Sequence, residues 1–228
     1  MAYCKISIAQ PTDQADRRFA AQALLFVNGL RKSVMEFIAQ FKKLDGHLFR
    51  FDTRIYLNYF NRDAESECVG AIIGKNPGSA APDELDRLMP LKPNGDKMLP
   101  FVGNRFVEGY ALARKAIPSN AFVRVWNLFY ACSKDLGEAI EIASTLDPLP
   151  ECPSERESVP LAWFGWGGNN ESLNKFKERF LHHKFRNAFY YDHISRHVVD
   201  QIPSVSAFAK HTQGMPAAPV VAHLAKSL

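Results

Sequence analysis

The chain of 228 residues carries 28 basic and 24 acidic side chains, for a formal net charge of +4, and 46% of its residues are hydrophobic. This length and apolar content suffice for one compact domain over residues 1–228 with a sizeable core. The mild positive charge permits a polyanionic partner without requiring one. No apolar run reaches membrane-spanning length and the N-terminus lacks a signal pattern, so we expect a cytoplasmic protein that binds no membrane.

The cysteines also exclude several kinds of site. Cys4, Cys68, Cys132 and Cys152 lie far apart and form no C-x-x-C pair. Structural zinc and iron–sulfur sites normally use closely spaced thiols, so neither a metal nor another cofactor is expected. In a cytoplasmic protein these thiols would be reduced.

Residues 1–68 contain two different patterns. Thr12 and Asp13 precede the stretch 14–44, whose apolar residues recur at helical spacing and predict a long helix with one buried face. The basic residues on its other faces fit a solvated helix surface better than a nucleic-acid stripe. In 47–60 apolar and polar residues alternate, which predicts one or two strands, the second case with a hairpin turn near Asp52 and Thr53.

The segment 69–80, VGAIIGKNPGSA, joins a short apolar run to a turn. This is typical of a buried parallel strand that opens into a loop, and ligands of open α/β sheets bind beyond the carboxyl ends of such strands. Gly74 and Gly78 allow a close approach of backbone to a ligand, and Pro77 stiffens the turn. Asn76 would then project from a rigid frame. An ordinary strand-to-helix turn would use the same residue types.

Between this loop and the next strand, the segment 81–99 is rich in Pro, Asp and Lys and includes a turn at 93–96, which predicts a mobile excursion. The run 101–105, FVGNR, follows, and 106–116 has helical spacing. A second parallel strand is predicted over 121–129, ending on Asn127. Asp135 is expected to cap a helix that extends to Ser144.

The C-terminal part repeats the alternation of strand and helix. After a proline-rich connector at 146–160, 161–168 predicts a third buried strand, and Asn169 or Asn170 would cap the following helix. A fourth strand is predicted over 205–210, before a Pro/Gly-rich loop and a short amphipathic tail. We therefore expect an α/β fold of three layers, α/β/α, with a small, mainly parallel, four-stranded central sheet plus the N-terminal helix and hairpin.

Four blocks in this order resemble the uracil-DNA glycosylase superfamily. Gly74–Gly78 resembles the G-x-N-P-G loop of its mismatch-specific branch, and PFVGNRF at 100–106 is similar to the aromatic and N-R-F run that follows there. The strand end VWNLF at 125–129 and the WFGWG run at 163–167 are similar to two further family strand ends. An uncharacterised bacterial branch, with an Asn-Pro-Ser loop, shows the same order. The resemblance covers 69–219, and residues 1–68 lie outside it.

The resemblance implies a role for each of these residues. In such an enzyme Asn76 would position the attacking water, and the adjacent Lys75 would contact a phosphate or the leaving group. Phe101 would stack on a flipped base, in a pocket that Gly74 and Pro77 help to form, and Asn127 would pair with the base edge. The residues implied to contact DNA are Arg105, Met215 and Ala218, with Met215 as a wedge in the emptied stack. The residue types also allow Phe101 to be a core aromatic and Asn127 a turn former.

Two features depart from the family pattern. The segment 81–99 lengthens the gap between Asn76 and Phe101, and Ala218 stands where the bacterial branch has the histidine that stabilises the departing base. His211 or His223 would have to replace that histidine.

We therefore expect a DNA glycosylase that leaves an abasic site at a damaged or modified base, such as a hypermodified pyrimidine, in duplex or single-stranded DNA, without an obligate protein partner. Two alternatives stay open. One is a catalytically inactive module of the same fold that binds nucleic acid or a nucleotide. The other is an enzyme that acts on free nucleosides or nucleotides.

Overall fold

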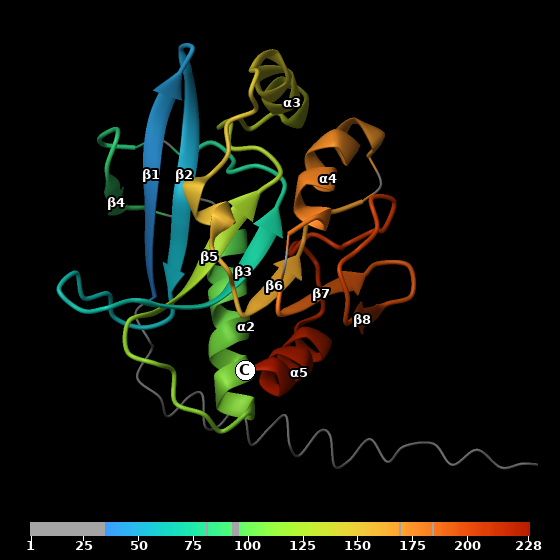
Figure 1. Ribbon diagram of the computed structural model, residues 1–228. Coiled ribbons are helices and arrows are strands. Elements are labelled where there is room, and N and C mark those ends of the chain that lie inside the picture. Colours follow the sequence, from blue (N-terminus) through green and yellow to red (C-terminus); the bar gives the residue numbers. More distant parts are fainter. Residues whose placement is uncertain (1–34, 81, 93–95, 169, 184) are drawn as a thin grey trace, which may run out of the picture. The chain divides into compact units, whose positions relative to one another are not determined.

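The computed structural model describes residues 35–80, 82–92, 96–168, 170–183 and 185–228, and these contain one mixed sheet of eight strands (Figure 1). The strand order is β4-β1-β2-β5-β3-β6-β7-β8. The strands are β1 (Glu36–Leu44), β2 (His47–Tyr56), β3 (Glu67–Gly74), β4 (Leu88–Pro90), β5 (Ala121–Asn127), β6 (Leu161–Phe164), β7 (Asn187–Asp192) and β8 (His197–Val199). The helices are α2 (Met98–Leu112), α3 (Leu136–Thr145), α4 (Asn174–Leu181) and α5 (Ala217–Ser227), with short 3₁₀ turns η1 (Pro153–Arg156) and η2 (Glu171–Leu173).

The expected α/β class is confirmed, but the sheet is larger than the four strands expected and is mixed. β3 pairs in parallel with β5 and β6, and β6 with β7, whereas β1, β2, β4 and β8 pair antiparallel. The prediction of a strand over 205–210 was wrong. Ala209 makes only isolated bridges to Gly167 and Asp192, so this segment crosses the ends of neighbouring strands instead of pairing along one. On the side of β6 away from β3, the neighbouring strand is β7.

In the N-terminal region one strand is confirmed within 47–60, namely β2, whereas the predicted helix and the predicted hairpin turn need correction. Of the helix predicted over 14–44, residues 14–34 lie outside the described residues, and Glu36–Leu44 form β1. The hairpin turns at Asp45 and Gly46, both with positive φ, and not near Asp52. Asp52 does have a φ of 42°, but at an irregularity within β2, where the register to β1 shifts between Ile38 and Gln40. An extra residue in one strand breaks the two-residue alternation that identifies strands.

The segment 81–99 is not a loop throughout. It contributes the edge strand β4, which pairs with β1, and the start of α2. Asp96 precedes the N-cap residue Lys97, and its Oδ1 accepts hydrogen bonds from the first backbone nitrogens of this helix, those of Met98 at 2.8 Å and Leu99 at 3.4 Å. Phe101 therefore lies in the first turns of a helix and not at a strand end. Part of the turn predicted at 93–96 lies outside the described residues.

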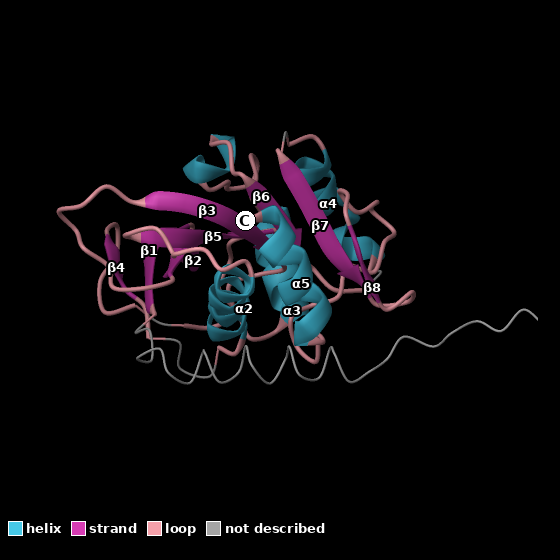
Figure 2. Ribbon diagram, turned by 90° about the horizontal axis from the view of Figure 1, so that it is seen from below, coloured by secondary structure: helices cyan, strands magenta, loops and turns pink. Residues whose placement is uncertain are grey.

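The helices cover both faces of the sheet. α3 and α4 pack on one face through Ala139, Ile142, Phe176 and Phe180. α2 and α5 pack on the other through Leu99, Val102, Phe106, Val220 and Leu224. These two helices lie side by side in both views (Figure 2). Burial of the two apolar faces of the sheet is what holds the layers together.

Several local predictions are confirmed. β3 runs into the turn at Gly74, β5 ends at Asn127, and Asp135 Oδ1 accepts a hydrogen bond from the backbone nitrogen of Glu138 at the start of α3. Asn170 caps η2, just before α4, whereas Asn169 lies outside the described residues. No helix among the described residues is long and apolar enough to span a membrane.

Candidate functional site

The loop after β3 opens into a cavity of about 920 Å³ at the carboxyl edge of the parallel strands. β3, β5 and β6 all end at this edge (Figure 1). Loops and helix ends from separate parts of the chain line the cavity: residues 76–80, 96–98 with Phe101, 133–134 and 211–214, together with Arg50 and Lys92. The loops that follow β3 and β5 thus converge at this edge of the sheet.

Asn76 faces this cavity with a defined orientation. Its Nδ2 donates a hydrogen bond to the backbone oxygen of Ser133 at 3.1 Å. A backbone oxygen can only accept, so the amide nitrogen must face Ser133 and Oδ1 is left to accept a hydrogen bond from a ligand or a water. Pro77 is buried and lines the same cavity, as does Gly78, which has a φ of 70°.

Phe101 lines the cavity from the first turns of α2 and is half-buried. Its ring lies 6.2 Å from that of Trp163, and the Arg105 guanidinium lies 5.0 Å from its centroid on a ring face. The ring therefore packs on the core and also contributes to the cavity wall.

Asn127 is completely buried and does not line the cavity. Within the described residues, neither its Oδ1 nor its Nδ2 has a hydrogen-bond partner. A β-carbon at Gly74 would lie 3.0 Å from Asn127 Oδ1 and 3.5 Å from the sulfur of Met98, a residue that does line the cavity. Gly74 thus leaves room for the side chains of Asn127 and Met98. A buried amide without partners is uncommon and costs free energy.

Lys75 does not line the cavity, although its charge acts on His211, which does. A β-carbon at Gly167, which has a φ of 90°, would lie 2.6 Å from Lys75 Cε and 2.9 Å from Nζ. The lysine therefore extends over the glycine turn after β6. Burial lowers the pKa of Lys75. The pKa of Lys177 is also lowered, chiefly by burial and then by the positive charge of Lys75.

His211 lines the cavity together with Asn76 and Phe101. Burial lowers the pKa of His211, and the positive charge of Lys75 lowers it further. The ring is therefore biased toward its neutral form. His223, the other candidate, lies on α5, where its ring is 4.4 Å from that of Phe189 and Nε2 is 3.8 Å from Asp200. It does not line the cavity.

The three residues implied to contact DNA are not brought together at the cavity. Arg105 pairs with Glu108 at 2.5 Å on α2. Met215 is only 5% exposed and belongs to the core beneath α2 and α5, which does not suit a wedge. Ala218 is exposed in the first turn of α5, a helix that begins inside the segment expected to be a loop.

The charge of the cavity wall was not anticipated from the sequence. Four cationic side chains line it, Arg50, Lys92, Lys97 and Lys134, against one carboxylate, Asp96. Arg50 is 1% exposed, and burial lowers the pKa of its guanidinium. Its burial depends on contacts with segments that are distant in the sequence, which the local pattern does not reveal.

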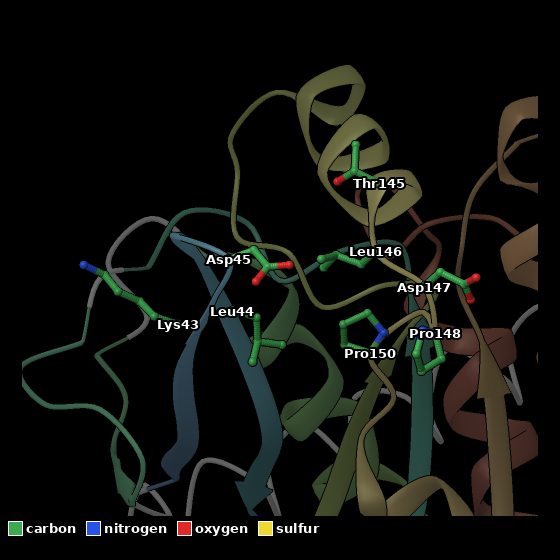
Figure 3. A pocket seen from close by; sticks show the side chains of 8 residues that line it. All are labelled: Lys43, Leu44, Asp45, Thr145, Leu146, Asp147, Pro148 and Pro150. Atoms are coloured by element: carbon green, nitrogen blue, oxygen red, sulfur yellow. The ribbon is translucent and has the colours of Figure 1, made fainter.

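A second hollow, of about 560 Å³, lies between the β1–β2 turn and the segment after α3 (Figure 3). Its lining includes Leu44, Leu146, Pro148 and Pro150, and the charged residues Lys43 and Asp147 lie on opposite sides of it. None of the predicted site residues lines this hollow.

No protein-family model matches the chain, and comparisons with curated proteins and with solved structures also found no match. In the described ranges, no three His, Cys, Asp or Glu side chains form a group that could hold a metal ion.

Proposed function

We propose that this chain is a DNA glycosylase that hydrolyses the N-glycosidic bond of a damaged or modified base and leaves an abasic site. The observation that carries the proposal is that Asn76, Phe101 and His211, which lie far apart in the sequence, line one cavity at the carboxyl edge of the sheet. The resemblance of the loop Gly74–Gly78 to the uracil-DNA glycosylase superfamily assigns hydrolysis to this edge.

The reaction breaks the bond between the base nitrogen and C1′ of the sugar and joins a water oxygen to C1′. The proton that this water loses neutralises the departing base. Asn76 Oδ1 would accept a hydrogen bond from the attacking water, because Nδ2 is committed to Ser133. Phe101 would stack on the flipped base. His211 lies on the same wall and would stabilise the negative charge that develops on the base.

A modified base suits the cavity better than plain uracil. The volume of the cavity, about 920 Å³, is near the upper end of the roughly 300–1,000 Å³ that small-molecule sites span. A hypermodified pyrimidine is our proposed target.

An abasic-site assay on purified protein tests the proposal. The substrates are duplexes and single strands that contain uracil, mismatches, or hydroxymethylated and glucosylated pyrimidines. We expect abasic sites on at least one modified substrate, and their loss in Asn76→Ala. The matched control is Asn187→Ala, an exposed residue at the start of β7, which should keep wild-type activity. Absence of product on every substrate would overturn the proposal.

The excess of cations in the cavity favours one second candidate, a module that binds nucleic acid or a nucleotide without catalysis. It predicts that the wild-type protein forms no abasic sites and that Asn76→Ala binds as tightly as the wild type. Filter-binding or fluorescence anisotropy measurements on the same substrates separate the two candidates.

A further inference from the structure

We infer that Arg50 is a binding residue for a phosphate group of the ligand, which makes the cavity a site for a phosphate-bearing nucleotide unit and not for an isolated base. Arg50 lies on β2, outside the part of the chain that resembles the glycosylase superfamily. The inference uses the same cavity as the proposed function, and it rests on that function only for the choice of a nucleotide as the ligand.

Arg50 is held rigidly at the cavity. Its backbone nitrogen donates to the oxygen of Tyr130 at 3.0 Å, and it pairs with Phe41 in the β1–β2 ladder. β2 runs antiparallel to β5, so the first residues of β2 lie at the carboxyl edge of the parallel strands. The side chain lines the cavity although it is only 1% exposed. Most of the side chain is therefore covered by protein, and only a small part of it forms the cavity wall.

The guanidinium is not satisfied within the described part of the chain. Nε and Nη2 have no hydrogen-bond partner there. Nη2 forms an ion pair with Asp96 Oδ2 at 3.8 Å, a distance too long for a hydrogen bond, and Oδ1 of the same carboxylate accepts from the first backbone nitrogen of α2. A buried cation with free donors is costly, and most such donors in folded proteins have a partner. A ligand anion would supply it.

The chemistry of the wall favours phosphate. Nε and Nη2 lie on one edge of the planar guanidinium, an arrangement that matches two oxygens of a phosphate. Both atoms are covered by protein in this structure, so a ligand would contact them after the side chain turns toward the cavity. The wall holds four cations and one carboxylate, so it attracts a group with more than one negative charge. Lys97 and Lys134 are exposed and would contact the outer oxygens, whereas Phe101 would hold the base.

Calorimetric titration of the full chain at fixed ionic strength tests the inference. The probes are inorganic phosphate, deoxyuridine 5′-monophosphate, deoxyuridine, and an oligothymidylate without terminal phosphates. We expect the monophosphate to bind about tenfold or more tightly than deoxyuridine if a terminal phosphate is bound. Strong binding of the oligothymidylate without that preference identifies an internal phosphodiester as the bound group. Either result supports the inference, provided that the affinity depends on Arg50.

Arg50→Lys keeps the charge and removes the two-donor edge. It should weaken the binding of the phosphate-bearing probes about tenfold and leave the affinity for deoxyuridine unchanged. If this variant does not fold, the double variant Lys97→Ala/Lys134→Ala replaces it, with Lys43→Ala at the second hollow as control. The double variant should bind several-fold more weakly, and the control should match the wild type. Unchanged affinity for inorganic phosphate, for the monophosphate and for the oligothymidylate in the folded test variant overturns the inference.

The readout is equilibrium binding and needs no turnover. A protein that binds the monophosphate through Arg50 but forms no abasic sites would retain this inference and refute the glycosylase. A protein that excises a base, with phosphate affinity independent of Arg50, would do the reverse.

Discussion

The side-chain amide of Asn76 donates a hydrogen bond to the backbone oxygen of Ser133, 57 positions further along the chain, at 3.1 Å. This contact ties the loop after β3 to the segment that follows β5, and both line the same cavity. A candidate water-positioning residue is therefore also a structural tie between two loops. The two roles are separable by substitution.

Asn76→Asp should destabilise the protein more than Asn76→Ala, although aspartate has nearly the shape of asparagine. The aspartate would place a second acceptor against the Ser133 oxygen, which should cost about 1–3 kcal/mol of unfolding free energy, whereas alanine removes one hydrogen bond worth about 1 kcal/mol. Urea denaturation followed by tryptophan fluorescence measures both. Equal stability of the two variants would show that the amide is not oriented in this way.

Phe101→Ala should weaken binding of a nucleotide or of DNA with a flipped base by about 5- to 150-fold, which corresponds to the roughly 1–3 kcal/mol of one base–aromatic stack. Fluorescence anisotropy on the best substrate measures the change. Phe60→Ala is the control, because Phe60 is also half-buried but packs 4.3 Å from the ring of Tyr56, away from the cavity. An equal loss of affinity in both variants would indicate general destabilisation.

Gly109→Ala should lower stability even though alanine is the better helix former by about 1 kcal/mol. A β-carbon at Gly109 in α2 would lie 2.9 Å from the Leu224 β-carbon on α5. That atom is fixed to the α5 backbone, so the helices would have to separate, at a cost of about 1–3 kcal/mol. A thermal melt checks the sign. A rise in the melting temperature would mean that α2 and α5 are not packed so closely.

Stability should fall as the pH drops below about 6.5, in part because of His211. The pKa of His211 is below its ordinary value of 6.5, chiefly through burial and then through Lys75. As the pH falls, the unfolded chain therefore takes up the proton first. The contribution of neutral His211 to stability is lost between pH 6.5 and the lower pKa of the folded state. His223 contributes in the same direction, since burial lowers its pKa as well.

Urea denaturation at a series of pH values measures this slope. His211→Gln and His223→Gln should each flatten it, and the double variant should show the sum, because the two histidines share no contact. Lys75→Met should raise the pKa of His211, which NMR titration of the ring detects. A wild-type slope in His211→Gln would contradict the placement of this ring in a desolvated wall.

The parts of the fold that local chemistry determines were predictable from the sequence. The apolar run before Gly74, the strand that ends at Asn127 and the cap at Asp135 each depend on neighbours within a few residues. β1 was not predictable in this way. Phe37, Ile38 and Phe41 have spacings that suit a helix as well as a strand with both faces covered. The structure has the latter, with Phe37 and Phe41 on one face of the sheet and Ile38 on the other. The Asp45-Gly46 pair was a usable hairpin signal that the interpretation of 14–44 as a helix overlooked.

The candidate site could be predicted where its residues belong to local motifs, and could not where they are brought to the cavity by strand pairing. Asn76 and Phe101 were found through their motifs, and His211 was named as a substitute for the histidine absent at position 218. Arg50 could not be recognised, because its place at the cavity results from the pairing of β2 with β5. Asn127 was correctly placed at a strand end, but the side of the strand that it faces, and its burial, depend on packing.

The β1–β2 hairpin also decides where this chain can be divided. The resemblance begins at Val69, which invites a shorter protein that starts there. Such a fragment would lack β2 and would leave bare the hydrogen-bonding edge of β5, a strand with all 7 residues buried. Bare edges of this kind pair with other chains. The fragment would also lose Arg50, so any graft of this pocket onto another scaffold must carry the hairpin with it.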